Sequence, residues 1–320
     1  MEELEGEILI TGGAGTLGKA IIQRATEESW DCHFTVFSRD AVKHARLKDR
    51  FPNVHTLMGD IRNYETLYAA MSGKDIVIHA GAVKIIPDSE WSSIDTFQIN
   101  VEGSMNVALA AANYGTPDVL AISTDKACHP ANAYGATKYL MEKAWQEYSR
   151  TGFKTRYHLV RYGNVLESTA SVVERWKIAA ANGEPVYLTD PKMTRFWLSP
   201  SQAVQYVLDS LSFKSGYIYV PKMPALSIGK LLEYVVGGNY FNIKSTPWRP
   251  GEKMHETLVT IEETDFCMSG GKPVLDNDYF AISPTTETRM NWKTEELTRP
   301  YSSDVARELT KEELEILLRG

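Results

Sequence analysis

The sequence is poor in cysteine and in long apolar runs, and it has no excess of basic charge. Its three cysteines, Cys32, Cys128 and Cys267, are far apart and form no CxxC pair, and its seven histidines are scattered. This excludes a disulfide framework and gives no metal-ligand spacing. No run approaches the ~18 uncharged apolar residues of a membrane-spanning helix. The net charge of −7 argues against a nucleic-acid surface over the whole protein. We therefore expect a reduced, cytoplasmic protein without a membrane span, a bound metal or a nucleic-acid partner.

The first half of the 320 residues alternates between apolar, β-rich runs and amphipathic stretches. Strands are expected at 7–10, 33–37, 54–58, 75–79, 119–123 and 155–160, and helices at 16–28, 64–71, 94–113 and 133–150. This alternation predicts a Rossmann-type α/β fold, a doubly wound parallel sheet with helices on both faces.

The second half is less regular. Helices are expected at 171–182, 201–210, 228–236 and 310–318, and a loop at 269–279. The simplest organisation has a dinucleotide-binding domain at residues 1–165, completed by segments near 200–221. Residues 166–320 then form mainly a smaller substrate-binding part.

Residues 11–19 read TGGAGTLGK, in which Gly12, Gly15 and Gly18 are spaced G-x-x-G-x-x-G between the first strand and the first helix. Glycines let the backbone turn sharply and approach a pyrophosphate, and a helix N-terminus offers N–H donors. The strand–turn–helix context predicts a dinucleotide site that also includes Thr16 and Leu17.

The end of the second strand bears on which dinucleotide binds. Ser38, Arg39 and Asp40 end this strand, and Lys43 follows shortly. An arginine here accommodates the 2′-phosphate of NADP, whereas a carboxylate selects NAD. We interpret Ser38, Arg39 and Lys43 as a 2′-phosphate site and expect NADP. If Arg39 is instead a surface charge paired with Asp40, NAD would serve.

Residues after the third and fourth strands complete the expected cofactor site. Asp60 and Ile61 are expected to flank the adenine. Ala80, Gly81 and Ala82 are small residues where a cofactor would pass close to the chain.

The motif Y-x-x-x-K occurs three times, at Tyr134/Lys138, Tyr139/Lys143 and Tyr240/Lys244. Only Tyr134 follows a strand that ends in a hydroxyl pair, Ser123-Thr124, which places Thr124 and Tyr134 at the ligand-binding edge of the sheet. Lys138 lies one helical turn from Tyr134, and its ammonium is expected to lower the pKa of the phenol. Such a phenol can deprotonate a sugar hydroxyl while hydride leaves for nicotinamide.

Asp125 and Lys126 directly follow Thr124. Alcohol oxidation needs only the tyrosine, the lysine and a hydroxyl, so an added acid and base indicate further proton transfers. Two solvated charges in a turn are the other explanation.

The strings TGGAGTLGK, FSRD, HAGAVKIIP, STDKACHPANAYGATK, VRYGNV, LTDPKMTRFW, VPKMP and RPGEKMHE occur in this order between residues 11 and 256. In these motifs the chain resembles the extended short-chain dehydrogenases/reductases of the polysaccharide-biosynthesis family, specifically the inverting UDP-N-acetylglucosamine 4,6-dehydratases. Residues 301–318 resemble the closing helix of that family.

The resemblance implies a hydro-lyase that converts UDP-GlcNAc to a UDP-4-keto-6-deoxy-HexNAc with inversion at C-5. Tyr134, supported by Lys138 and Thr124, would deprotonate the C-4 hydroxyl as hydride passes to NADP. Lys126, as a neutral amine, would take the C-5 proton. Asp125, as a protonated acid, would protonate the departing C-6 hydroxyl.

The same resemblance implies a homo-oligomer and a sugar-nucleotide site. The residues of that site are Lys84, Arg161, Asn164, Arg195, Arg249 and Glu252. The chain departs from the family at residues 167–172, ESTASV, where GSRGSV is usual. The runner-up function is a nucleotide-sugar 4-epimerase or C-4 oxidoreductase, which would not need Asp125 and Lys126. A non-catalytic NADP sensor or scaffold is a further alternative, and the altered loop favours it.

Overall fold

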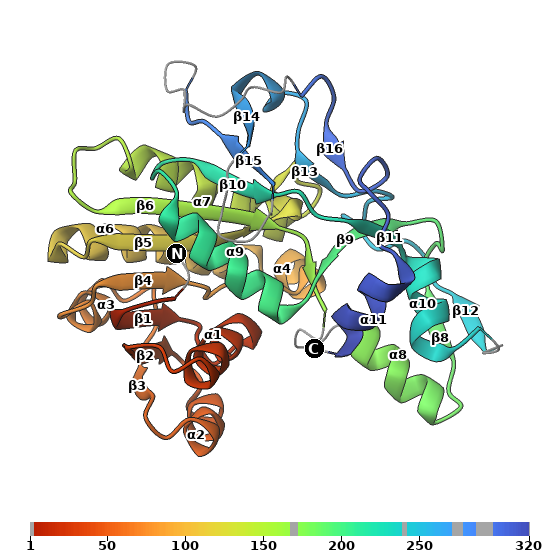
Figure 1. The fold of residues 1–320 in the computed structure, drawn as a ribbon, viewed down its shortest axis with the longest axis horizontal. Helices are drawn as coiled ribbons and strands as arrows, with labels where there is room; N and C mark the ends of the chain where they lie inside the picture. The colour runs from red at the N-terminus through yellow and green to blue at the C-terminus, as the bar shows by residue number, and fades with distance from the viewer. Residues whose placement is uncertain (1–2, 167–171, 239–241, 271–277, 286–296, 320) are drawn as a thin grey trace.

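The computed structural model describes residues 3–166, 172–238, 242–270, 278–285 and 297–319. Among these residues the main element is a nine-stranded sheet with the order β14-β15-β10-β6-β5-β4-β1-β2-β3 (Figure 1). Its strands are β1 (Gly6–Thr11), β2 (Cys32–Ser38), β3 (His55–Met58), β4 (Ile76–His79), β5 (Asp118–Thr124), β6 (Arg156–Tyr162), β10 (Ile218–Pro221), β14 (Cys267–Gly270) and β15 (Tyr279–Ile282). From β3 to β10 all neighbours are parallel, and β15 and β14 are antiparallel additions. The predicted α/β fold is confirmed.

Helices cover both faces of this sheet, as the apolar character of its strands requires. On one face α1 (Thr16–Glu27) packs against α9 (Pro200–Ser212), and on the other lie α3 (Tyr64–Ala70), α6 (Ser104–Tyr114) and α7 (Ala133–Tyr148) (Figure 1). The strand residues Ile8, Leu9 and Ile10 are fully buried between these layers. Sequence analysis did not predict α2 (Ala41–Arg50), a largely polar helix whose N-cap is Asp40.

The single helix expected at 94–113 is wrong in detail. The structure has α4 (Ile86–Trp91), α5 (Ser93–Phe97), a π-helix η1 (Gln98–Gly103) and then α6. In η1 the buried Asn100 amide accepts from the Val83 N–H at 2.8 Å and donates to the Val83 carbonyl at 2.9 Å. It also donates to the Thr137 hydroxyl at 3.1 Å. The π-turn therefore ties the segment after β4 to α7, a register change that apolar periodicity does not reveal.

The remaining elements form a smaller part with its own core. They are the sheets β11 (Ala225–Ser227)-β9 (Thr194–Leu198)-β7 (Asn164–Val165), β12 (Ile243–Ser245)-β8 (Val186–Leu188) and β13 (Thr257–Val259)-β16 (Tyr301–Ser302), and the helices α8 (Val172–Ala181), α10 (Ile228–Val236) and α11 (Lys311–Arg319). Trp176, Leu231, Leu232 and Leu314 are buried together between the three helices.

The chain crosses between the two parts more than once. After β9 it returns to the main sheet through α9 and β10, and again through β14 and β15. The loop expected at 269–279 is therefore wrong at its ends, since Ser269 lies in β14 and Tyr279 in β15, while 271–277 lie outside the described residues. No helix in the described part of the chain is both long enough and apolar enough to cross a membrane.

Candidate active site

A cleft of about 970 Å³ runs along the carboxyl ends of the parallel strands. Every residue predicted to bind the cofactor lines it: Gly12, Gly15, Thr16, Leu17, Gly18, Ser38, Arg39, Lys43, Asp60, Ile61, Ala80, Gly81, Ala82, Tyr134 and Lys138. Thr124 and Lys126 line the same cleft. Asp125 is fully buried beside them. The structure thus brings the residues predicted to bind the cofactor and the residues predicted to be catalytic into one place. The role of each residue is still a prediction.

The glycines of the first turn leave no room for side chains. Gly12 has a φ of +69°, and a Cβ there would lie 2.7 Å from the Cα of Gly81. A Cβ on Gly18 would lie 2.2 Å from the carbonyl oxygen of Gly13. Gly15 is the N-cap of α1 and offers no side-chain acceptor to the helix. A turn of this shape fits a dinucleotide pyrophosphate, which needs close backbone approach and N–H donors.

Cations lie at the end of the cleft next to β2. Asp40 pairs with Lys43, at 3.1 Å between the carboxylate and Nζ, and not with Arg39. The half-exposed Arg39 guanidinium instead lies 3.4 Å from the Asp60 carboxylate. Hydrogen bonds from Arg62 lower the pKa of Asp60, although burial opposes them. Asp60 is therefore ionised at neutral pH and attracts Arg39 only across a long contact, which leaves the guanidinium accessible.

Tyr134 lies beside the hydrogen-bonded pair of Thr124 and Asp125. The Thr124 hydroxyl donates to Asp125 Oδ1 at 2.8 Å, and the Tyr134 phenol lies close enough to interact with Thr124. Burial raises the pKa of Tyr134 and the charge of Asp125 adds to this, while the Thr124 hydrogen bond opposes it. The predicted lowering of the Tyr134 pKa by Lys138 is therefore wrong for this conformation.

Lys138 is turned toward its own helix. Its Nζ lies 2.9 Å from Met141 Sδ, and burial lowers the pKa of this ammonium to about 8, with Glu142 opposing the shift. The second motif is different, because the ring of Tyr139 is half exposed and carries Lys143 on its face at 5.2 Å. Tyr240 lies outside the described residues.

Asp125 and Lys126 form a tight ion pair. Lys126 Nζ donates to the two carboxylate oxygens of Asp125 at 2.9 and 3.1 Å, and to the amide oxygen of Asn164 at 2.9 Å. The lysine side chain is 15% exposed and the aspartate fully buried. The two residues are thus not solvated charges in a turn. Lys126 lines the cleft with the buried Asp125 behind it, and Asn164, predicted to bind substrate, accepts a hydrogen bond from the lysine.

Close packing at the start of α7 places Tyr134 against this pair. The Asn132 side chain caps α7 by accepting from the Gly135 N–H at 2.8 Å. A Cβ on Gly135 would lie only 2.1 Å from the Lys126 carbonyl oxygen. The glycine after Tyr134 therefore lets α7 begin in contact with the turn that carries Asp125 and Lys126.

Two arginines predicted to bind substrate are buried structural groups, so those predictions are wrong. Arg161 is fully buried and donates to the Glu142 carboxylate at 2.7 and 2.8 Å and to the Glu263 carboxylate at 2.8 Å twice. Arg195 is buried and donates to the backbone oxygens of Lys253 and Met254 at 2.9 and 3.1 Å. All the donors of Arg161 are used, both terminal nitrogens of Arg195 are used, and the remaining Nε of Arg195 lies 3.8 Å from the buried Glu256 carboxylate. Both lie on strands whose residues are almost all buried, and sequence alone does not separate a buried structural arginine from one that binds a ligand.

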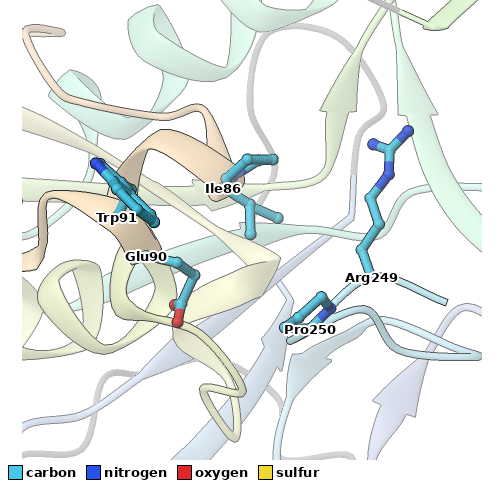
Figure 2. A pocket seen from close by; sticks show the side chains of 6 residues that line it. Ile86, Glu90, Trp91, Arg249 and Pro250 are labelled. Atoms are coloured by element: carbon cyan, nitrogen blue, oxygen red, sulfur yellow. The ribbon is translucent and has the colours of Figure 1, made fainter.

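The other predicted substrate residues lie toward solvent. Lys84 lines the main cleft, and burial of its ammonium lowers its pKa. Arg249 lines a second pocket of about 310 Å³ with Ile86, Pro87, Glu90, Trp91 and Pro250. Figure 2 shows Arg249 and Pro250 on one side of this pocket and residues of α4 on the other. Glu252 accepts from the Arg249 backbone N–H at 3.2 Å. In the altered loop, residues 167–171 lie outside the described residues.

Sequence analysis missed Glu256. Its buried carboxylate lies 3.8 Å from Lys126 Nζ and 3.8 Å from Arg195 Nε. The residue closes the RPGEKMHE string, but nothing in local spacing relates it to a lysine 130 positions earlier.

The sheet, the glycine turn and the tyrosine–lysine helix define an α/β protein with a Rossmann-like dinucleotide cleft. The chain belongs to the polysaccharide biosynthesis protein family, whose sequence pattern matches residues 8–272. The predicted family is confirmed.

Several individual proteins of known sequence or structure are similar to this chain over most of its length. The inverting UDP-N-acetylglucosamine 4,6-dehydratase of Campylobacter jejuni is 35% identical over 284 residues, 87% of this chain and 83% of the relative. UDP-glucose 4-epimerase of Rickettsia bellii is 36% identical over 268 residues, 80% and 78% of the two chains. The structure of Pen from Bacillus thuringiensis aligns with a TM-score of 0.86 at 30% identity, covering 100% of this chain and 99% of Pen. Streptomyces venezuelae DesIV, a dTDP-glucose 4,6-dehydratase with NAD and TYD bound, shares the fold, with a TM-score of 0.70 at 20% identity over 78% and 86% of the chains.

Replacing Arg161 by Met tests whether this arginine is structural. The change leaves the Glu142 and Glu263 carboxylates without their cation, so we expect a loss of about 3–5 kcal/mol in the free energy of unfolding. Urea denaturation followed by circular dichroism measures this. Arg156→Met on the same strand is the control, because its side chain is 62% exposed, and should cost about 1 kcal/mol or less. Unchanged stability of Arg161→Met, with weaker binding of UDP, would restore the substrate role.

Proposed function

We propose that the protein is an NADP-dependent UDP-N-acetylglucosamine 4,6-dehydratase, a hydro-lyase that forms a UDP-4-keto-6-deoxy-HexNAc with inversion at C-5. The observation that carries the proposal is the ion pair of Asp125 and Lys126, which adjoins Thr124 and Tyr134 at the main cleft. Identity of 35% to the Campylobacter jejuni dehydratase over 87% of this chain supports it.

The cofactor would lie along the cleft from the glycine turn to Tyr134. Its pyrophosphate would take N–H donors at the N-terminus of α1, and Arg39, Lys43 and Ser38 would surround a 2′-phosphate. When bound, a nicotinamide dinucleotide accepts hydride from a sugar carbon and can return it to another carbon of the same sugar. Residues 1–165 with 200–221 would hold the dinucleotide, and 166–320 mainly the sugar nucleotide.

Tyr134 would take the proton of the C-4 hydroxyl. A phenol with a raised pKa is a base only when a cation stabilises the phenolate. Lys138 supplies that cation, because a pKa of about 8 leaves its ammonium mostly protonated at pH 7. Rotation of the flexible lysine side chain from Met141 toward the phenol brings the charge to Tyr134. Thr124 then holds the phenol oxygen in place.

Asp125 and Lys126 would carry out the elimination. Moving one proton along their 2.9 Å hydrogen bond converts ammonium and carboxylate into a free amine and a carboxylic acid, with no change in net charge. The amine of Lys126 takes the C-5 proton, which the neighbouring ketone has made acidic, and the C–H electrons form the C-4/C-5 enolate. The acid of Asp125 then protonates the C-6 hydroxyl, and water leaves as the C-6–O bond breaks. Elimination leaves a C-5/C-6 double bond. The hydride held by the dinucleotide would be returned to C-6, and a proton added to the other face of C-5 would give the 6-deoxy sugar with inversion.

The sugar nucleotide needs cations for its phosphates. We assign Lys84, which lines the main cleft, and Arg249, at the neighbouring pocket, to this role, with Glu252 fastening the backbone of Arg249. Residues of α4 line both the main cleft and this pocket, so a UDP group would extend from the cleft along that helix.

We also propose that the protein is a cytoplasmic homo-oligomer. Its nucleotide ligands and its three free cysteines fit a reducing compartment. Trp91, Ile94 and Leu140, on α4, α5 and α7, are 92%, 76% and 45% exposed. Since α4 and α5 both pack against α7, these apolar side chains offer a surface for a second copy of the chain.

The alternative function is 4-epimerisation. The Rickettsia relatives, up to 36% identical, are UDP-glucose 4-epimerases. Oxidation and reduction at C-4 would need a general base such as Tyr134 but no elimination step. A buried acid–base pair at the cleft has no step to perform in a 4-epimerase, which favours dehydration.

Incubation with UDP-GlcNAc in deuterated water, followed by proton NMR, tests the reaction. We expect a new C-6 methyl signal together with deuterium at C-5. Lys126→Met and Asp125→Asn should each lower the rate by about 10²–10⁴-fold, whereas Lys154→Met, a change of an exposed lysine, should leave it unchanged. A C-4 epimer without a methyl signal would establish the alternative, and normal dehydration by Lys126→Met would remove the proposed base.

Arg39→Ala tests the choice of dinucleotide. Loss of the guanidinium should weaken NADPH binding at least about tenfold, since each phosphate–arginine contact contributes a charge-assisted hydrogen bond, and leave NADH binding nearly unchanged. Fluorescence titration of the protein measures both. Arg46→Ala, a change of an exposed arginine in α2, is the control. Equal effects on the two dinucleotides would leave NAD as the cofactor.

Light scattering coupled to size-exclusion chromatography tests assembly. We expect the wild-type chain to elute as an oligomer and the double variant Ile94→Glu/Leu140→Glu as a smaller, folded species, because two charges would be buried in the interface. The control is Ile178→Glu, a change of a residue of α8 that is 56% exposed. An unchanged mass of the double variant would contradict the proposed surface.

A further inference from the structure

The carboxylate of Glu256 is buried among three cations without a hydrogen bond to any of them. Glu256 is 5% exposed. One carboxylate oxygen lies 3.8 Å from Lys126 Nζ and 3.8 Å from Arg195 Nε, and the other lies 3.8 Å from Lys253 Nζ. That second oxygen, Oε2, has no hydrogen-bond partner among the described residues. Because buried polar atoms are nearly always hydrogen-bonded, this unused acceptor needs an explanation.

The three cations are committed to other oxygens. Lys126 donates to Asp125 and Asn164. Lys253 donates to the carbonyl of Cys128 at 2.6 Å. Arg195 donates to backbone carbonyls of the segment that carries Glu256. Glu256 therefore supplies negative charge at ion-pair distance, while the two lysines and the terminal nitrogens of Arg195 donate to other oxygens.

The backbone fixes Glu256 in this place. Its N–H donates to the Ser303 hydroxyl at 2.9 Å, and its carbonyl accepts from the Ser303 N–H at 2.8 Å. Nearby, the Asn132 side chain donates to the Gly251 carbonyl at 3.1 Å. The segment of residues 251–256 is thus fastened both to the residue that follows β16 and to the N-cap of α7, the helix that carries Tyr134. The smaller part of the protein therefore places the Glu256 carboxylate next to Lys126, which follows β5 of the main sheet.

The changes of charge in the proposed reaction indicate a role for the Glu256 carboxylate as a counter-ion. When Lys126 has taken the C-5 proton and Asp125 still holds its own, the ammonium no longer faces an ionised Asp125. An uncompensated charge at this depth is costly. Resting on the proposed function, we propose that Glu256 is a positioning residue that serves as the second counter-ion of Lys126 while Asp125 is protonated.

Three cations face the Glu256 carboxylate: Lys126, Arg195 and Lys253. Arg195 and Lys253 take no part in the proposed proton transfers, so Lys126 is the one of these three cations whose charge would change. Asp125 and Asn164 are the other groups on Lys126, and Asn164 does not titrate. Because an anion stabilises a nearby ammonium, the charge of Glu256 favours the protonated form of Lys126.

Glu256→Gln tests the proposal, because it removes the charge and keeps the shape. The maximal kcat should fall at least about tenfold with KM within about twofold, and both limbs of the pH–rate profile should move to lower pH by about one unit. Glu256→Asp, which keeps the charge, should recover most of the shift. Glu262→Gln, a change of an exposed carboxylate with the same loss of charge, should follow the wild type. A Glu256→Gln profile that coincides with that of the wild type would overturn the proposal.

Chemical labelling gives a readout that does not depend on turnover. Reductive methylation modifies the free amine, so at a fixed neutral pH the peptide that contains Lys126 should be methylated about tenfold faster in Glu256→Gln than in the wild type. Mass spectrometry measures this. Equal labelling would overturn the proposal even if turnover falls. If the wild type forms no dehydrated product but the labelling shift is present, the proposed function fails and the charge coupling stands. If the melting transition shows that Glu256→Gln does not fold, Glu256→Asp provides the test instead. This variant moves the carboxylate away from Lys126, so its pH–rate profile and its rate of Lys126 methylation must change in the same direction by a smaller amount.

Discussion

The site depends on keeping opposite charges together in a place that water scarcely reaches. Asp125 is fully buried and Lys126 nearly so, and each would be unstable there without the other. The strand β5 and the start of α7 supply the framework, because the close approach at Gly135 leaves no space between the helix and the turn. The remaining features of the site, from the Thr124 hydrogen bond to the placement of Tyr134, follow from where this ion pair is held.

The two buried charge clusters differ in how completely their hydrogen bonds are satisfied. Around Arg161, two carboxylates and a backbone carbonyl accept from the guanidinium, and the Ser123 hydroxyl donates to Glu142. Such a cluster stabilises one arrangement and resists a change of charge. Around Lys126 the second carboxylate, that of Glu256, has an unused acceptor. The unused acceptor leaves Glu256 free to interact more strongly with Lys126 when the charge of Asp125 is lost.

The parts of the site that could be predicted from the sequence are those formed by residues close together in the chain. The glycine turn and the pair Tyr134/Lys138 rest on spacings of three or four residues, and such spacings determine which groups share a turn or a helix face. Arg161 and Arg195 were assigned to substrate because an arginine in a motif resembles a phosphate ligand. Their real partners, Glu142, Glu263 and the carbonyls of residues 253–254, come from other segments of the chain. The π-helix escaped prediction for a related reason, since Asn100 is fixed by Val83 and Thr137.

Direct proton sharing also explains why three different polar groups are strung together at this edge of the sheet. The Thr124 hydroxyl has one proton, and in this structure it donates that proton to Asp125. If Asp125 is protonated, the carboxyl group becomes a donor and Thr124 can turn its own proton toward the phenolate of Tyr134. The same proton shift that frees the amine of Lys126 would therefore stabilise the ionised tyrosine. Oxidation at C-4 and elimination across C-5 and C-6 would then draw on a single rearrangement of hydrogen bonds, and the residues of the two steps need to be adjacent for that reason.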